Sequence, residues 1–167
     1  IELDPEPDYI KYAEKQLWLN IKEKCINGRR TGLGITAEGD MLAALGIRYG
    51  TNEGNEFSNK VHQILKIAAY SASVDMAKDR GSFPIYNSER EENNPFIQRI
   101  KEEDPDLYSK MCKYGRRNIA LLTIAPTGSV SILTQTTSGI EPAFLISYMR
   151  RRKINPNDTD VRVDFTD

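Results

Sequence analysis

The feature that most restricts the fold is an uninterrupted helical pattern between Glu53 and Arg80. Its apolar residues recur every three or four positions and form one stripe, and Gly81 ends the pattern. Small residues crowd the middle of the segment, which favours close packing against a second element. The sequence therefore predicts a helix-rich fold built around this segment. The stripe consists of Phe57, Val61, Ile64, Leu65, Ala68, Ala72 and Met76.

Five shorter helices are predicted from periodicity and from residues typical of helix ends. In the first, Asp8 is a candidate cap, Cys25 falls on the apolar stripe and is expected to be buried, and Asn27-Gly28 closes the helix. Pro95 and Pro105 open two of the others, a position where proline is favoured. The predicted spans are Tyr9–Ile26, Glu38–Leu45, a helix from Pro95, a helix from Asp104-Pro105 to Tyr114, and Val130–Thr134.

Short apolar runs predict a few strands between these helices. Ile119–Ile124 is continuous and β-branched, as expected of a strand buried on both faces. Further strands are expected at Thr31–Thr36, Phe144–Met149 and, as an edge strand, in the stretch VRVDF, whereas SEREENN reads as a solvated loop. Helical connections favour parallel pairing. We expect a helix-rich α/β fold with a few short parallel strands, residues 1–167 forming one domain.

The chain's totals exclude several classes of protein. It has 167 residues and a net charge of −1, which gives no general attraction to nucleic acid or to anionic membranes. No apolar run is long enough to cross a bilayer, and a cytoplasmic location is expected. Cys25 and Cys112 form no disulfide framework or metal-type spacing, and His62 is the single histidine, so no metal site is predicted.

The turn after Ile119–Ile124 has the composition of an anion cradle. In the stretch APTGSVS, Gly128 has no Cβ to block a phosphate oxygen, and Thr127 and Ser129 add hydroxyl donors. The lysine of the nucleoside-triphosphatase loop is missing, so ATP hydrolysis is not expected. A Pro-Thr-Gly-Ser turn is also an ordinary structural turn, and local sequence leaves both interpretations open.

Two longer stretches carry a resemblance to a known family. GRRTGLGITAEGDMLAALGIRYG at 28–50 and GRRNIALLTIAPTGSVSILTQTTSGIEP at 115–142 resemble the catalytic large subunit of ribonucleotide reductases. The Pro-Thr-Gly-Ser form of the turn is most similar to the adenosylcobalamin-dependent, or class II, branch. The resemblance implies that the chain is a C-terminal part of a ten-stranded α/β barrel, a portion of its second half.

The same resemblance implies a site. The loop Pro126, Thr127, Gly128, Ser129 and Val130 is expected to hold the phosphates of a ribonucleoside di- or triphosphate, with Glu141 as a candidate brace.

The family's thiyl-radical chemistry uses a cysteine in an Asn-x-Cys-x-Glu loop, and neither Cys25 nor Cys112 matches that pattern. The resemblance therefore implies no catalytic residue in this segment, which should be inactive without the remainder of the reductase chain. It also implies adenosylcobalamin as the cofactor of the parent enzyme, with none bound by this segment alone. Exposed strand edges make self-association of the segment a further expectation.

Two other functions remain open from the sequence. One is a non-catalytic module that binds a nucleotide or phosphate, and the other is a small helical nucleic-acid binder that uses arginine clusters. These clusters are scattered and balanced by acids, which favours a solvated face or internal ion pairs. They comprise Arg29-Arg30, Arg116-Arg117 and Arg150–Lys153.

Overall fold

The computed structural model of the chain describes residues 5–147, 149–152 and 162–166. Within these residues the chain forms seven helices and two strands, and it divides into two compact units. Unit 1 contains Ile1–Gly34 and Asn55–Ala125, and unit 2 contains Ile35–Gly54 and Pro126–Asp167. The single domain expected over residues 1–167 stays a prediction.

Unit 1 contains the long helix and most of the shorter ones, as the periodicity predicted. Its caps explain where two of them begin: the side chain of Asn94 accepts a hydrogen bond from Phe96 N–H, and that of Asp104 accepts one from Leu107 N–H, each at 2.9 Å. Gly81, with φ +77°, follows the long helix. The elements are α1 (Asp8–Gly28), nearly all of α3 (Asn52–Arg80), α4 (Ser88–Glu91), α5 (Pro95–Glu103) and α6 (Pro105–Tyr114).

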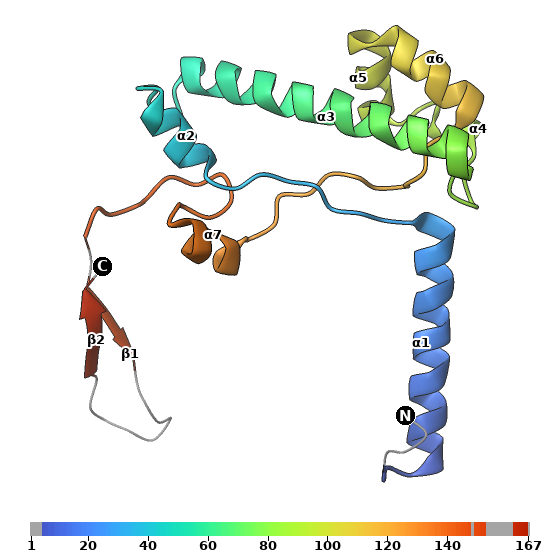
Figure 1. Ribbon diagram of the computed structural model, residues 1–167, viewed down its shortest axis with the longest axis horizontal. Helices are drawn as coiled ribbons and strands as arrows, with labels where there is room; N and C mark the ends of the chain where they lie inside the picture. Colours follow the sequence, from blue (N-terminus) through green and yellow to red (C-terminus); the bar gives the residue numbers. More distant parts are fainter. Residues whose placement is uncertain (1–4, 148, 153–161, 167) are drawn as a thin grey trace. The chain divides into compact units, whose positions relative to one another are not determined.

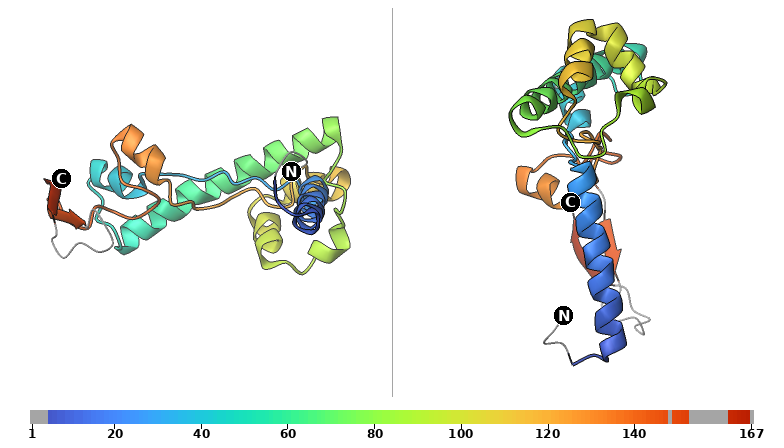
Figure 2. Two further views of the ribbon diagram at one scale, coloured as in Figure 1. Left: turned by 90° about the horizontal axis from the view of Figure 1, so that it is seen from below. Right: turned by 90° about the vertical axis from the view of Figure 1, so that its right-hand side faces the viewer.

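The core of unit 1 lies where α5 and α6 pack against the C-terminal half of α3 (Figures 1 and 2). Each helix contributes residues one turn apart, so a single apolar face of each is buried. The extended chain after α6 adds one more side chain to this cluster. The buried residues are Tyr70 and Val74 of α3, Ile97 and Ile100 of α5, Leu107 and Met111 of α6, and Leu121.

Helix α1 departs from the prediction in its burial. Gly28 is its only buried residue among those described, and Cys25 is exposed rather than covered. No described helix of unit 1 packs along α1 (Figure 1), so no helix of that unit covers the apolar stripe of α1. The helix is closed by Arg29 in the left-handed conformation, φ 46°, rather than by the glycine expected there.

The acidic stretch expected to be a solvated loop instead forms the short helix α4. Asn87 caps it by accepting a hydrogen bond from Arg90 N–H at 3.2 Å. The helix places Glu91 against the buried guanidinium of Arg116, with which it forms an ion pair through both carboxylate oxygens. A tertiary contact therefore fixes a segment that looked purely polar.

The two predicted strands of unit 1 are reduced to one isolated parallel bridge between Leu33 and Leu122. Leu33 N–H donates to Leu121 O at 2.7 Å, and Thr123 N–H donates to Leu33 O at 3.0 Å. The parallel direction is as expected. The expected burial of 119–124 on both faces is wrong in the described residues, because Thr123 and Ile124 are exposed. A strand is buried on both faces only where other elements pack above and below it. The helical cluster of unit 1 covers Leu121 and Leu122, and it does not include Thr123 or Ile124.

Unit 2 contains α2 (Glu38–Ala44), α7 (Gly128–Thr134) and the strands β1 (Met149–Arg152) and β2 (Arg162–Thr166). Both helices were predicted. The strand expected at Phe144–Met149 is wrong, because pairing begins only at Met149. β1 and β2 pair antiparallel, with Met149 opposite Thr166 and an irregularity between Arg150 and Arg151.

The fold is therefore helix-rich, as predicted, and the predicted set of short parallel strands is not confirmed in the described residues. Their one ladder is antiparallel, and their parallel pairing is a single bridge. The ten-stranded barrel stays a prediction. Among the described helices, none combines the length and apolar character that crossing a bilayer requires.

Candidate phosphate-binding loop

The predicted loop lies at the start of α7 and faces solvent. Pro126, Gly128 and Ser129 are exposed, Thr127 is half-buried, and Val130 is 49% exposed. A Cβ built on Gly128 would meet no atom within 4 Å, and the residue does not adopt a left-handed φ. The space in front of Gly128 is therefore open, as a site for an oxyanion requires.

The backbone donors of this loop are available. In the described part of the chain, the N–H groups of Gly128, Ser129 and Val130 form no hydrogen bond, and the ladder of α7 starts with Ser131 N–H donating to Thr127 O at 2.8 Å. Consecutive free amides at the start of a turn are the groups that bind phosphate oxygens in proteins. The exposed hydroxyl of Ser129 adds a donor beside them.

Thr127 differs from its sequence-based role. Its hydroxyl was expected to face an anion, but its Oγ1 accepts a hydrogen bond from Gly139 N–H at 2.9 Å and lies 3.0 Å from Thr36 Oγ1. Its backbone is left-handed, with φ 49°, which is uncommon and unfavourable for a β-branched residue. The side chain of Thr127 is thus part of the loop's support.

Three segments of unit 2 meet behind the loop. Asp40 Oδ2 accepts a hydrogen bond from Thr137 N–H at 2.8 Å, and the amide of Glu38 donates to Gly139 O at 3.4 Å (Figure 1 shows the chain after α7 returning to the start of α2). A Cβ on Gly39 would lie 2.5 Å from the backbone of Pro142, so only glycine fits there.

Sequence reasoning missed this support. Glu141 was expected to brace the loop, but the contact described for its carboxylate is local, an acceptance from Ile140 N–H at 3.1 Å. The bracing groups are Thr36 and Asp40, which stand in the stretch TAEGD. The signal available in the sequence was a glycine in the first turn of a helix, Gly39, which predicts a close approach by other backbone.

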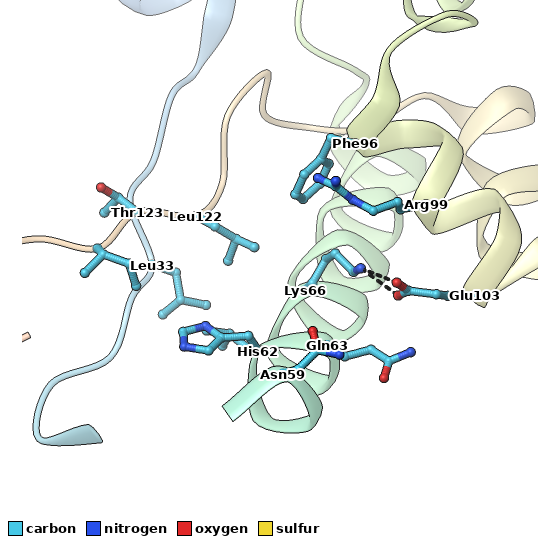
Figure 3. Close-up of a pocket in the computed structure, with 12 residues that line it drawn as sticks. Leu33, Asn59, His62, Gln63, Lys66, Phe96, Arg99, Glu103, Leu122 and Thr123 are labelled. Atoms are coloured by element: carbon cyan, nitrogen blue, oxygen red, sulfur yellow. Dashed lines mark hydrogen bonds and ion pairs between the residues drawn. The ribbon is translucent and has the colours of Figure 1, made fainter. Parts of the chain in front are cut away.

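A separate cleft of about 470 Å³ lies within unit 1, between α3, α5 and the extended chain (Figure 3). Leu33 and Leu122 form an apolar wall that faces α3. On the opposite side Lys66 Nζ pairs with Glu103 at 2.7 and 2.6 Å, so both charges are already neutralised. Arg99 lies over the ring of Phe96 and lines the same cleft.

Three of the four arginines in these clusters whose side chains are described contact other groups of the chain, and the fourth, Arg30, is exposed. Arg116 is paired with Glu91, Arg29 donates to a backbone carbonyl at 2.8 Å, and Arg117 donates to two others at 2.7 and 3.0 Å. These contacts favour internal pairing over a nucleic-acid surface. The side chains of Arg150–Arg152 lie outside the described residues.

Comparison with known proteins identifies the family. The family model for the barrel domain of ribonucleotide reductase matches residues 10–162. The chain belongs to the ribonucleotide reductase family. This confirms the resemblance that the stretches at 28–50 and 115–142 indicated.

Similar reductases have the following names. A "vitamin B12-dependent ribonucleoside-diphosphate reductase" of Mycobacterium tuberculosis is 33% identical over 123 residues, which are 73% of this chain and 15% of that protein. A protein of the same name from Thermoplasma acidophilum is 34% identical over 149 residues, 89% of this chain and 16% of its own length. A "ribonucleoside-diphosphate reductase subunit alpha" of Treponema pallidum is 27% identical over 128 residues, which are 75% of this chain and 15% of that protein. The chain thus spans about a sixth of the length of these reductases.

Proposed function

We propose that this chain is the part of a ribonucleoside-diphosphate reductase that holds the phosphates of the substrate, through the loop Pro126–Val130. The observation that carries the proposal is the row of unpartnered amides at Gly128, Ser129 and Val130 in front of open space, in a chain of this family. A diphosphate bears several anionic oxygens, and backbone amides bind them without a lysine.

The loop binds and orients the substrate rather than reacting with it. Fixing the phosphates positions the ribose for chemistry elsewhere in the enzyme, and such positioning is a large part of catalysis. In the parent enzyme that chemistry is the thiyl-radical reduction of the ribonucleotide, performed by a cysteine loop that this segment lacks. The segment alone is then a binding element without turnover.

The cofactor belongs to the parent enzyme in this proposal. Two of the similar proteins are named vitamin B12-dependent, and the Pro-Thr-Gly-Ser form of the loop agrees with that branch. Adenosylcobalamin would supply the radical that starts the reaction. We assign no residue of this chain to the cofactor.

The test uses the full-length reductase carrying this segment, with a ribonucleoside diphosphate such as CDP as substrate. Ser129→Ala removes one charge-assisted hydrogen bond, and we expect the Michaelis constant to rise about 5- to 30-fold, the equivalent of roughly 1–2 kcal/mol. Gly128→Val fills the open space and should raise it further. Because a Cβ at Gly128 would meet no protein atom within 4 Å, we expect little effect on folding.

Ser109→Ala is the matched control, since it removes an exposed hydroxyl from α6, outside the loop. Its Michaelis constant should equal that of the unmodified enzyme. An unchanged Michaelis constant in both Ser129→Ala and Gly128→Val would overturn the proposed role of the loop.

A further inference from the structure

The loop is held in place by a chain of hydroxyl groups from residues far apart in the sequence. Gly139 N–H donates to Thr127 Oγ1 at 2.9 Å, Thr127 Oγ1 lies 3.0 Å from Thr36 Oγ1, and Thr36 Oγ1 donates to Thr137 O at 3.2 Å. A hydroxyl has one hydrogen to give. Since the hydroxyl hydrogen of Thr36 is donated to the carbonyl of Thr137, the hydroxyl of Thr127 donates to Thr36. The hydrogen bonds therefore run in one direction, from Gly139 N–H through Thr127 and Thr36 to Thr137 O, and we call this series the relay.

This relay holds an unfavourable backbone conformation. Thr127 is left-handed at φ 49°, and Ala37, next to Thr36, is left-handed at φ 63°. Such conformations in residues other than glycine persist where surrounding contacts impose them, and they cluster at functional sites. The left-handed turn at Thr127 immediately precedes the free amides of the loop, so it sets the direction in which they point.

A carboxylate reinforces the relay from the first turn of α2. Asp40 Oδ2 accepts a hydrogen bond from Thr137 N–H at 2.8 Å, while the carbonyl of Thr137 accepts from Thr36. The backbone N–H and C=O of Thr137 are therefore both hydrogen-bonded to residues at the start of α2, the N–H to Asp40 and the C=O to Thr36. The close fit of Gly39 against Pro142 holds the same two segments together.

We propose that Thr36 and Asp40 are positioning residues for the substrate's phosphates, which fix Thr127 so that the loop amides converge on one anion. The inference rests on the proposed function of the loop. Thr36 and Asp40 do not touch the phosphate, and they act by removing alternative loop conformations that would have to be lost on binding. Their effect falls on substrate affinity.

The first experiment replaces Thr36 with valine, which keeps the shape and removes the hydroxyl. In the full-length reductase we expect the Michaelis constant for CDP to rise about 5-fold, the value of one neutral hydrogen bond, with kcat within 2-fold. Thr36→Ser restores the hydroxyl and should return the Michaelis constant to within 2-fold of the original. Asp40→Asn keeps an acceptor oxygen and should have a smaller effect than Asp40→Ala.

Thr51→Val is the matched control. Thr51 Oγ1 also donates to a carbonyl, at 2.7 Å, and accepts from an amide, at 3.2 Å. It lies in unit 2, and these hydrogen-bond partners, Arg48 and Gly54, are outside the loop. It should lower the stability of the enzyme to a similar extent without changing the Michaelis constant. A purely structural role of Thr36 would make the two variants behave alike.

The outcomes separate this inference from the function on which it rests. A raised Michaelis constant in Thr36→Val, rescued by Thr36→Ser, supports the relay. If Ser129→Ala raises the Michaelis constant and Thr36→Val does not, the relay is overturned and the phosphate loop stands. If Ser129→Ala, Gly128→Val and Thr36→Val all leave it unchanged, the proposed function fails and the relay with it. Should Thr36→Val not fold, the comparison of Asp40→Asn with Asp40→Ala decides in the same way.

Discussion

The buried guanidinium of Arg116 offers the sharpest test of what holds unit 1 together. Its side chain is 3% exposed and is paired with Glu91, whose side chain is 17% exposed. It also donates to the backbone carbonyls of Asn118 at 3.0 Å and Ile119 at 3.2 Å. Three aromatic rings surround it at 5.5–5.9 Å from their centroids, those of Phe83, Tyr70 and Tyr86.

Replacing Arg116 with methionine keeps the aliphatic stem and removes every one of these polar contacts. Breaking a buried ion pair by deleting one partner costs about 3–5 kcal/mol. Glu91 retains some access to water, so the lower end of that range applies, and we expect a loss of about 3 kcal/mol in the free energy of unfolding. The measurement is denaturant unfolding of the chain followed by helical circular dichroism.

Arg99→Met is the matched control for this experiment. Arg99 also lies over an aromatic ring, 5.6 Å from the centroid of Phe96, but it is exposed and forms no ion pair with a described residue. Its loss should cost about 0.5–1 kcal/mol. The double variant Arg116→Met with Glu91→Gln should be more stable than the sum of the single losses predicts, since it leaves no buried charge. If Arg116→Met costs no more than Arg99→Met, the reasoning is refuted.

Two further predictions concern unit 1. Burial raises the pKa of Tyr86 from 10.0 to about 12, so the folded state keeps a proton that the unfolded state loses above pH 10. In unfolding titrations, the stability of the unmodified chain relative to Tyr86→Phe should be constant below about pH 10 and fall between about pH 10 and about pH 12. A stability difference that does not change with pH would contradict this. A Cβ on Gly34 would lie 2.1 Å from Thr123 O. Gly34→Ala should therefore lower the free energy of unfolding by about 2 kcal/mol or more, because it separates the paired segments. Gly128→Ala adds a Cβ that faces open space and should leave stability unchanged, and equal effects of the two variants would contradict the assigned contact.

Local patterns determined the helices. The stripe of α3, the prolines at the starts of α5 and α6, and Gly81 after Arg80 each act within one or two turns, so sequence alone placed these elements to within a few residues. The predicted turn at Gly128 and Ser129 is instead the first turn of α7, so the helix was predicted but begins two residues earlier than expected.

Contacts between distant residues decided the rest. Thr36 and Thr127 are 91 positions apart, and Arg116 and Glu91 are 25 apart, so nothing in either neighbourhood indicated that the hydroxyl of Thr127 supports the loop or that an acidic stretch turns inward. The run 119–124 had the composition of a buried strand, but a strand forms only where other backbone is available to pair with it. Periodicity is a property of a single segment. Pairing and burial each require two segments, and only the tertiary structure shows which segment is the partner.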